Sequence, residues 1–108
     1  MTILTDELLK SFDASITDVS TAETMPPEIY TSEEFLEFER RTIFSQEWLC
    51  AGRASRIPNA GDYFTTTLNG EHLIVARDKT GNVNAFSSIC RHRGMQICED
   101  SGNCGTFT

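Results

Sequence analysis

The sequence has few basic residues and no long apolar run, and each absence excludes a class of protein. Nine Lys and Arg residues stand against 16 Asp and Glu in 108 residues, which gives a formal net charge of −7. Nucleic acids and anionic membranes bind basic surfaces, so we expect neither as a partner. A membrane-spanning helix needs about 18 or more consecutive apolar residues, and the sequence contains no such stretch.

A secretory signal is also missing from the first residues. Met1–Lys10 carries Asp6 and Glu7 and has no basic segment followed by an apolar core. We therefore expect a cytoplasmic protein, in which thiols stay reduced. Its cysteines are then better candidates for metal ligands or buried thiols than for disulfides. There are four of them: Cys50, Cys90, Cys98 and Cys104.

Residues 1–45 are expected to form a helical arm with a linker. Apolar residues four apart predict a short amphipathic helix within Met1–Phe12, and Thr5 and Asp6 can cap a shorter version of it. A capping box, with Thr31 at the N-cap and Glu34 three residues later, predicts the start of a second helix. We expect that helix to run to about Phe44.

From residue 46 to residue 108 the pattern alternates between apolar and polar residues, which predicts a second, mainly β domain built as an antiparallel meander. Asn69-Gly70 is a strong signal for a tight hairpin turn. Trp48 is expected in the core, and Cys50 is expected to be a buried thiol. The predicted strands are Trp48–Arg53, Tyr63–Leu68, His72–Arg77 and Val83–Ser88.

The clearest candidate metal ligands are Cys90 and His92, which follow directly on the last predicted strand. Thiolate and imidazole both suit iron and zinc, and Gly94 permits a sharp turn of the backbone around a bound metal. Cys98 and Cys104 can complete a Cys₃His zinc site with this pair. Their spacing lacks the compact C-x₂-C pairs that are typical of structural zinc sites.

The run Cys90-Arg91-His92-Arg93-Gly94 resembles the first ligand loop of Rieske proteins. Other stretches resemble the large (alpha) subunits of aromatic-ring-hydroxylating oxygenases, and together they cover about residues 25–108. The resemblance implies an antiparallel Rieske-like β-sandwich, incomplete here, preceded by an N-terminal helical arm. The stretches are Met25-Pro26-Pro27-Glu28-Ile29-Tyr30, Ala51-Gly52-Arg53, Gly61-Asp62-Tyr63-Phe64, Ile74-Val75-Ala76-Arg77-Asp78 and Gly81-Asn82-Val83-Asn84-Ala85-Phe86.

The resemblance implies a [2Fe–2S] cluster with Cys90 and His92 as its first ligand pair. In Rieske centres two His replace two Cys on one iron, and the reduction potential rises to about −150 to +300 mV. The second pair, C-x-x-H, would begin directly after Thr108, and Gly105–Thr108 is expected to be the strand that leads into it. Because two ligands do not hold a cluster that needs four, we expect residues 1–108 alone to bind no cluster and to be inactive.

The function implied by the resemblance is electron relay in an oxygenase. The cluster takes electrons from a ferredoxin or a reductase and passes them to a mononuclear Fe(II) site in a C-terminal domain, within a homotrimer or an alpha/beta hetero-oligomer. The substrate is an aromatic compound or a quaternary amine, and no catalytic residue is predicted here. Two alternatives remain open, a small Rieske-type electron carrier and a structural zinc-binding domain. Arg91 and Arg93 are either solvated charges or a basic rim that faces an acidic electron donor.

Overall fold

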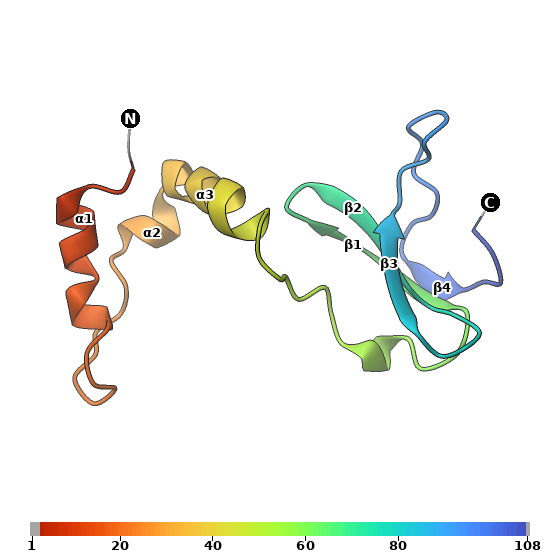
Figure 1. Cartoon of the computed structure of the whole chain (residues 1–108), viewed down its shortest axis with the longest axis horizontal. Coiled ribbons are helices and arrows are strands. Elements are labelled where there is room, and N and C mark those ends of the chain that lie inside the picture. The colour runs from red at the N-terminus through yellow and green to blue at the C-terminus, as the bar shows by residue number, and fades with distance from the viewer. Residues whose placement is uncertain (1–2, 108) are drawn as a thin grey trace. The chain divides into compact units, whose positions relative to one another are not determined.

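The computed structural model describes residues 3–107 and contains two compact units, one ending at Glu47 and the other beginning at Trp48 (Figure 1). The first unit is helical and the second holds the sheet. A domain boundary at residues 45 and 46 stays a prediction from the sequence. No helix within residues 3–107 is long and apolar enough to cross a membrane.

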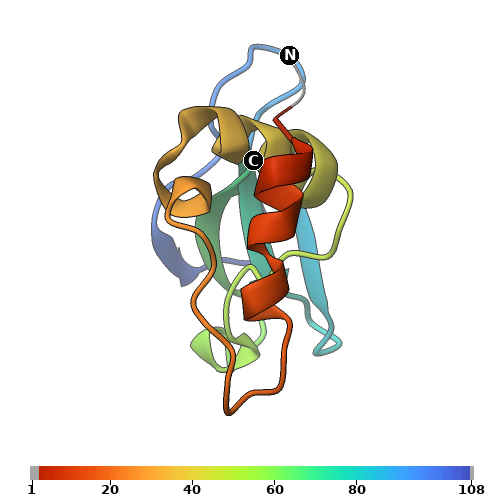
Figure 2. The ribbon, with the colours of Figure 1, turned by 90° about the vertical axis from the view of Figure 1, so that its left-hand side faces the viewer.

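The helical unit consists of short elements joined by turns, and Figure 2 shows α1 with the turn that follows it. Thr5 begins α1, because its Oγ1 accepts a hydrogen bond of 3.1 Å from the Leu8 N–H. The shorter version of the helix predicted within Met1–Phe12, with Thr5 as its cap, is confirmed, and the first two residues of that range lie outside the described part. The elements are α1 (Asp6–Ser11), η1 (Asp13–Ser15), α2 (Glu28–Thr31), α3 (Glu33–Glu39) and the π-helix η2 (Arg40–Phe44).

The N-cap of α3 is Ser32, so the prediction of Thr31 was wrong by one residue. Ser32 Oγ accepts a 3.1 Å hydrogen bond from the Phe35 N–H. Thr31 instead ends α2, and its hydroxyl donates to the Pro27 carbonyl over 3.2 Å. The short helix that follows Pro27 uses Thr31 as its last residue, so the break between helices falls at Ser32. Helical structure continues to Phe44 through η2.

The second unit contains one antiparallel sheet of four strands in the order β3-β2-β1-β4 (Figure 1). Asn69 and Gly70 join the two central strands, and both have positive φ, 47° and 83°. This is the two-residue turn that the Asn-Gly pair predicted, since such turns match the twist of the flanking strands. The strands are β1 (Asp62–Leu68), β2 (Glu71–Arg77), β3 (Val83–Ser87) and β4 (Ser101–Asn103).

The core of this unit lies on one face of the two central strands. Phe64 and Val75 pack with Ile57, and Ala51 covers them from the side. Arg77 connects the sheet to the preceding segment, because its Nε donates a 2.6 Å hydrogen bond to the Ile57 carbonyl. These contacts fix β1 and β2, and β3, which leads into the candidate metal loop, pairs with β2.

Four predictions for this unit were wrong, concerning the strand at Trp48–Arg53, the burial of Trp48, the burial of Cys50 and a strand at Gly105–Thr108. Trp48–Arg53 is not a strand, Trp48 is fully exposed and Cys50 is exposed. The outer edge of β1 pairs with Ser101–Asn103 and not with residues 48–53. A segment with no hydrogen-bonded partner strand does not form a strand, even where its side chains alternate. The strand expected at Gly105–Thr108 is not formed by the described part of that range, and the last strand, β4, ends at Asn103. Residues 105–107 are irregular, and Thr108 lies outside the described residues.

Candidate metal centre

Cys90 and His92 lie on a loop that extends the sheet beyond the end of β3 (Figure 1). An isolated bridge between Ile89 and Gln96 keeps the two arms of the loop together. The turn is closed by two backbone hydrogen bonds, from Cys90 N–H to the Met95 carbonyl at 2.7 Å and from Gly94 N–H to the Cys90 carbonyl at 2.9 Å. Gly94 has a φ of 64°, a conformation that favours glycine.

Ser88 anchors the base of this loop and was not singled out from the sequence. Its side chain is fully buried, and its Oγ donates to the Cys98 carbonyl over 3.3 Å. Its backbone N–H donates a 2.8 Å hydrogen bond to the His72 carbonyl on β2. The Ser88 carbonyl in turn accepts a hydrogen bond from the Ile97 N–H. The local pattern gave no signal for its burial, because Phe86, two residues earlier, is itself exposed.

The two predicted ligands present free donor atoms on one turn. Cys90 is half-buried and His92 is exposed. Neither side chain makes a hydrogen bond to another residue in the described range 3–107. A free thiol and a free imidazole two residues apart fit one half of a mixed Cys and His ligand set. Within that range no group of three or more His, Cys, Asp or Glu side chains is placed to hold a metal ion.

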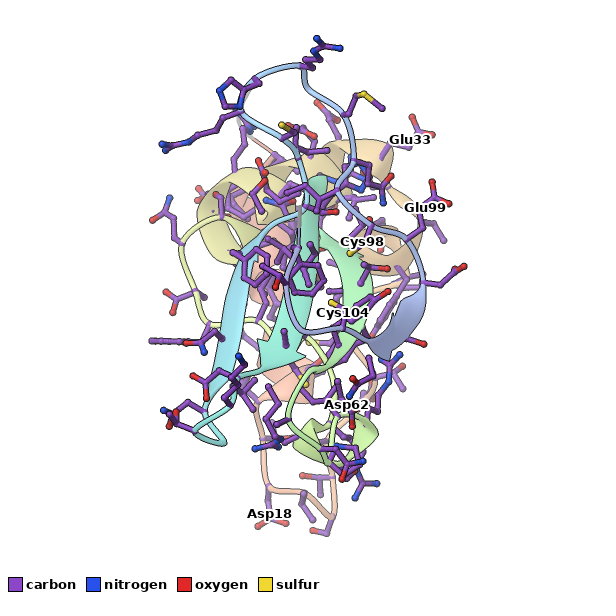
Figure 3. All side chains as sticks on the ribbon, turned by 90° about the vertical axis from the view of Figure 1, so that its right-hand side faces the viewer. Asp18, Glu33, Asp62, Cys98, Glu99 and Cys104 are labelled. Carbon is purple, nitrogen blue, oxygen red and sulfur yellow. The ribbon has the colours of Figure 1, made fainter. Side chains whose placement is uncertain are left out.

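The alternative zinc site with Cys98 and Cys104 gains no support from this geometry. Figure 3 shows both side chains towards the sheet, below the tip of the loop. Burial, and then the neighbouring Cys104, raises the pKa of the Cys98 thiol above its ordinary value. Within residues 3–107 these thiols form no group of three or more potential metal ligands with Cys90 and His92.

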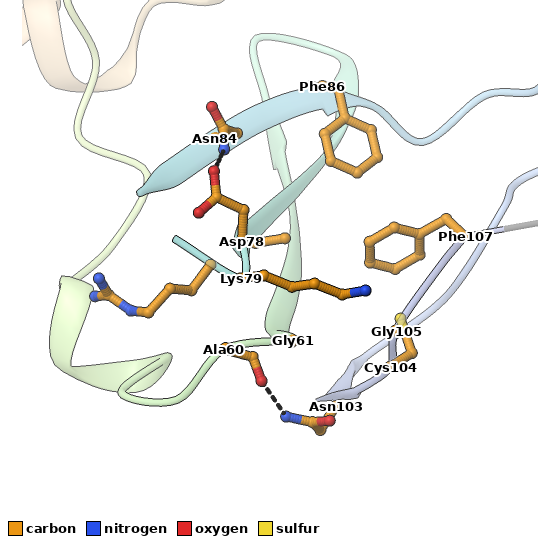
Figure 4. Close-up of a pocket in the computed structure, with 12 residues that line it drawn as sticks. Ala60, Gly61, Asp78, Lys79, Asn84, Phe86, Asn103, Cys104, Gly105 and Phe107 are labelled. Carbon is orange, nitrogen blue, oxygen red and sulfur yellow. Dashed lines mark hydrogen bonds between the residues drawn. The ribbon is translucent and has the colours of Figure 1, made fainter. Parts of the chain in front are cut away.

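The hollow shown in Figure 4 lies at the other end of the sheet and has a volume of about 300 Å³. Neither Cys90 nor His92 lines it. The ring of Phe107 forms one wall and makes an edge contact with Phe86, 5.4 Å between centroids. Asn103 Nδ2 donates a 3.0 Å hydrogen bond to the Ala60 carbonyl. This hollow is therefore separate from the turn that carries Cys90 and His92.

His72, the other histidine of the chain, plays a different part. It is exposed on β2, and its Nδ1 lies 3.0 Å from the Thr67 hydroxyl on β1. This contact bridges the β1–β2 hairpin near its turn. His72 is consequently a suitable reference when the role of His92 is tested.

Comparison with known proteins gives a consistent result. The family model of the Rieske [2Fe–2S] domain matches residues 47–108. The alpha subunit of biphenyl 2,3-dioxygenase from Rhodococcus jostii (strain RHA1) is 40% identical over 99 residues, which cover 89% of this chain and 22% of that subunit. The carnitine monooxygenase oxygenase subunit of Acinetobacter baumannii is 35% identical, covering 73% of this chain and 21% of that subunit.

Among solved structures, naphthalene 1,2-dioxygenase from a Rhodococcus species bound to indole matches with a TM-score of 0.68 and 34% identity. That match covers 93% of this chain and 23% of the dioxygenase chain. The present chain thus spans about a fifth of the length of the curated relatives that it matches.

Proposed function

This chain belongs to the family of Rieske [2Fe–2S] domains, and on that premise we propose that it is the electron-receiving part of an iron-dependent oxygenase. The observation that supports this most directly is the turn after β3, where Cys90 and His92 stand together with free donor atoms. The turn lies within the residues that match the family model. The homologues are Rieske non-haem iron dioxygenases and monooxygenases.

In this proposal Cys90 and His92 would be two of the ligands that hold the cluster, Cys90 through its thiolate and His92 through its imidazole. A bound Rieske cluster supplies one-electron transfer at a potential higher than that of an all-cysteine cluster. The half-buried Cys90 keeps its ligand atom partly shielded from water, while the exposed His92 faces the surface. The Ser88 anchor holds the base of the turn on β2 and so limits how far the two donors move apart.

We further propose that the complete oxygenase would also hold a mononuclear iron, in a domain outside residues 1–108, which would supply the O₂ chemistry when bound. A 2-His-1-carboxylate site with open positions is the usual ligand set for such iron. A ferredoxin or a reductase is the proposed donor, and a homotrimer or an alpha/beta hetero-oligomer the proposed assembly. Among substrates we favour an aromatic hydrocarbon over a quaternary amine. The biphenyl dioxygenase subunit is 40% identical and matches over more of this chain than the carnitine monooxygenase subunit, which is 35% identical.

The test is anaerobic purification of the oxygenase subunit that carries residues 1–108, followed by visible absorption and EPR spectroscopy of the reduced protein. We expect a Rieske-type signal that is lost in Cys90→Ser and in His92→Ala. Matched controls are Cys50→Ser and His72→Gln, which remove the same kinds of side chain outside the loop and should keep the signal.

Zinc in place of iron, with no visible absorbance, would contradict the proposal. A Rieske signal that persists in both Cys90→Ser and His92→Ala would contradict the assignment of these two ligands. Parallel measurements on Cys98→Ser and Cys104→Ser test the zinc alternative, because a Cys₃His site needs both of those thiols.

A further inference from the structure

Two hydroxyl groups hold the returning arm of the candidate metal loop against the sheet. The returning arm is the stretch between the turn and β4, residues 95–100. Ser88 Oγ donates to the Cys98 carbonyl over 3.3 Å. Thr65, on β1, donates twice to the Asp100 carbonyl, from its backbone N–H and from its hydroxyl, each over 2.8 Å. We call Ser88 and Thr65 the hydroxyl clasp.

Both members of the hydroxyl clasp lie on the same face of the sheet. Thr65 pairs with Ile74 on β2, and Ile74 pairs with Phe86 on β3. Paired residues of antiparallel strands share a face, and Ser88 comes two residues after Phe86, with its N–H still bonded to the His72 carbonyl. Ser88 and Ile74 are fully buried. Because further protein packed around this unit can only decrease the exposure of a side chain, the Ser88 hydroxyl is an interior group in the complete protein as well.

The backbone at one end of the hydroxyl clasp has an uncommon conformation. Asp100 has a φ of 57°, in the left-handed region that favours glycine. Such a conformation costs energy for a residue with a side chain, and it persists where the surrounding structure fixes it. The two hydrogen bonds from Thr65 supply that constraint. Residues held in this way cluster at functional sites, which points to a role beyond the pairing of β1 with β4.

The returning arm also contacts the arm that carries the candidate ligands. Cys90 N–H donates to the Met95 carbonyl over 2.7 Å, and Ile97 N–H donates to the Ser88 carbonyl over 2.6 Å. Ser88 thus bonds to the returning arm through its side chain and its backbone, two residues before Cys90. A displacement of the returning arm from the sheet therefore displaces the backbone of Cys90 and, with it, the thiol.

We propose that Ser88 and Thr65 are positioning residues for the cluster, and that their hydroxyl groups set the geometry of Cys90 and His92 through the returning arm. The inference rests on the proposed function, because it gives these two residues a role toward the cluster that this function requires. Groups that hydrogen-bond behind metal ligands fix the orientation of those ligands, and loss of one commonly costs 10- to 100-fold in metal affinity. Both hydroxyls act through the backbone of the loop, and neither is a candidate ligand.

The experiment compares variants of the oxygenase subunit that carries residues 1–108, loaded anaerobically with its cluster. Thr65→Val removes one hydroxyl with little change in shape, and Ser88→Ala removes the other. Each is expected to release iron to a chelator about ten-fold faster than wild type and to shift the g values of the Rieske EPR signal. Thr65→Ser keeps the hydroxyl and should keep the wild-type rate and g values. Thr66→Val makes the same change at the next position, on the opposite face of β1, and should also leave both unchanged.

A loss of fold stability by itself also speeds the release of iron, so the experiment includes a variant that changes stability alone. Val75→Ala opens a cavity on the opposite face of β2, in the core with Phe64 and Ile57, and leaves the hydroxyl clasp intact. We expect Val75→Ala to lower the melting temperature while its g values remain those of wild type.

Shifted g values in Thr65→Val and Ser88→Ala, with wild-type values in Thr65→Ser and Val75→Ala, would support the positioning role. If Ser88→Ala does not fold, the comparison of Thr65→Val with Thr65→Ser decides the question. Wild-type g values in the two hydroxyl-deletion variants, whatever their melting temperatures, overturn the positioning role and leave the proposed function standing. The same holds if Thr65→Ser shifts the g values as much as Thr65→Val. A wild-type protein without a Rieske spectrum overturns both proposals.

Discussion

The helical unit and the sheet unit differ in how far apart along the sequence their hydrogen-bonded residues lie. In the helical unit Ser15 Oγ donates to the Thr24 carbonyl, nine positions away. In the sheet unit Asn103 Nδ2 donates to the Ala60 carbonyl, 43 positions away. Helices shorter than about 12 residues are marginal in water unless tertiary packing supports them. The sheet unit has such packing around Phe64, and the candidate metal loop extends from this better-supported part.

The largest expected effect is that of removing a ring from the sheet core. Phe64 is 2% exposed, and Phe64→Ala should lower the free energy of unfolding of the sheet unit by about 3–5 kcal/mol, the usual range for a buried Phe. Phe38→Ala, at a half-buried ring on α3, should cost clearly less. Urea unfolding followed by hydrogen exchange of β1 and α3 amides measures both. Equal losses for the two variants would contradict the contrast between the units.

A second test concerns a close approach of two distant segments. Gly61 has a φ of 86°, and a Cβ there would lie 2.8 Å from the Cys104 carbonyl oxygen. Gly81 has a φ of 90° with nothing within 4 Å of its Cβ position. Gly81→Ala should therefore cost about 1–2 kcal/mol from backbone strain, and Gly61→Ala about 1–3 kcal/mol more from the added clash. Thermal unfolding compares the pair, and equal melting temperatures would show that the β1–β4 contact is looser than described.

In the helical unit a smaller effect is expected at the cap of α3. Ser32→Ala removes the acceptor of the Phe35 N–H and should cost about 1 kcal/mol of local helix stability. Thr31→Ala is the control, since Thr31 donates to Pro27 instead of capping α3. Hydrogen exchange of the Phe35 amide gives the readout. Faster exchange in Thr31→Ala than in Ser32→Ala would restore the capping box expected from the sequence.

The smallest effect is a dependence on pH in the β2–β3 turn. The Thr80 hydroxyl, with backbone N–H groups of Thr80 and Asn82, donates to Asp78 and lowers the pKa of that carboxyl to about 2. Because the folded pKa lies below the ordinary value of 3.8, the stabilisation is complete above about pH 4 and is lost as the pH falls towards 2.

Asp78→Asn should flatten the acid dependence of unfolding between pH 4 and 2, the window set by this pKa. Glu71→Gln, which removes an exposed carboxylate from the start of β2, is the control for the change in formal charge. Acid titrations monitored by circular dichroism compare the variants. An unchanged slope in Asp78→Asn would mean that the turn contributes nothing to acid stability.

Local sequence patterns predicted the parts of the fold that depend on near neighbours. Alternation and the Asn69-Gly70 turn located β1, β2 and β3, because consecutive strands of a hairpin pair with each other. The same alternation misplaced a strand at Trp48–Arg53. The partner of β1 on its outer edge is β4, a three-residue strand with no distinctive pattern. Its position depends on contacts across the chain that no local pattern encodes.

The candidate site likewise contains residues that the local sequence pattern identified and a residue that it did not. The Cys-x-His pattern and its position after a strand identified Cys90 and His92, and their assignment as cluster ligands stays a prediction. Ser88 was missed, because a serine in a strand is ordinary and its significance comes from the Cys98 carbonyl ten positions later.

The most direct test of the central claim is pulsed EPR of the reduced, cluster-loaded protein with ¹⁵N-labelled histidine. If His92 is a cluster ligand, the wild-type spectrum contains couplings from two histidine nitrogens. His92→Cys loses one of them, and its reduction potential falls towards the value of about −400 mV of an all-cysteine cluster. His72→Gln keeps both couplings. Couplings that are unchanged in His92→Cys would contradict the account.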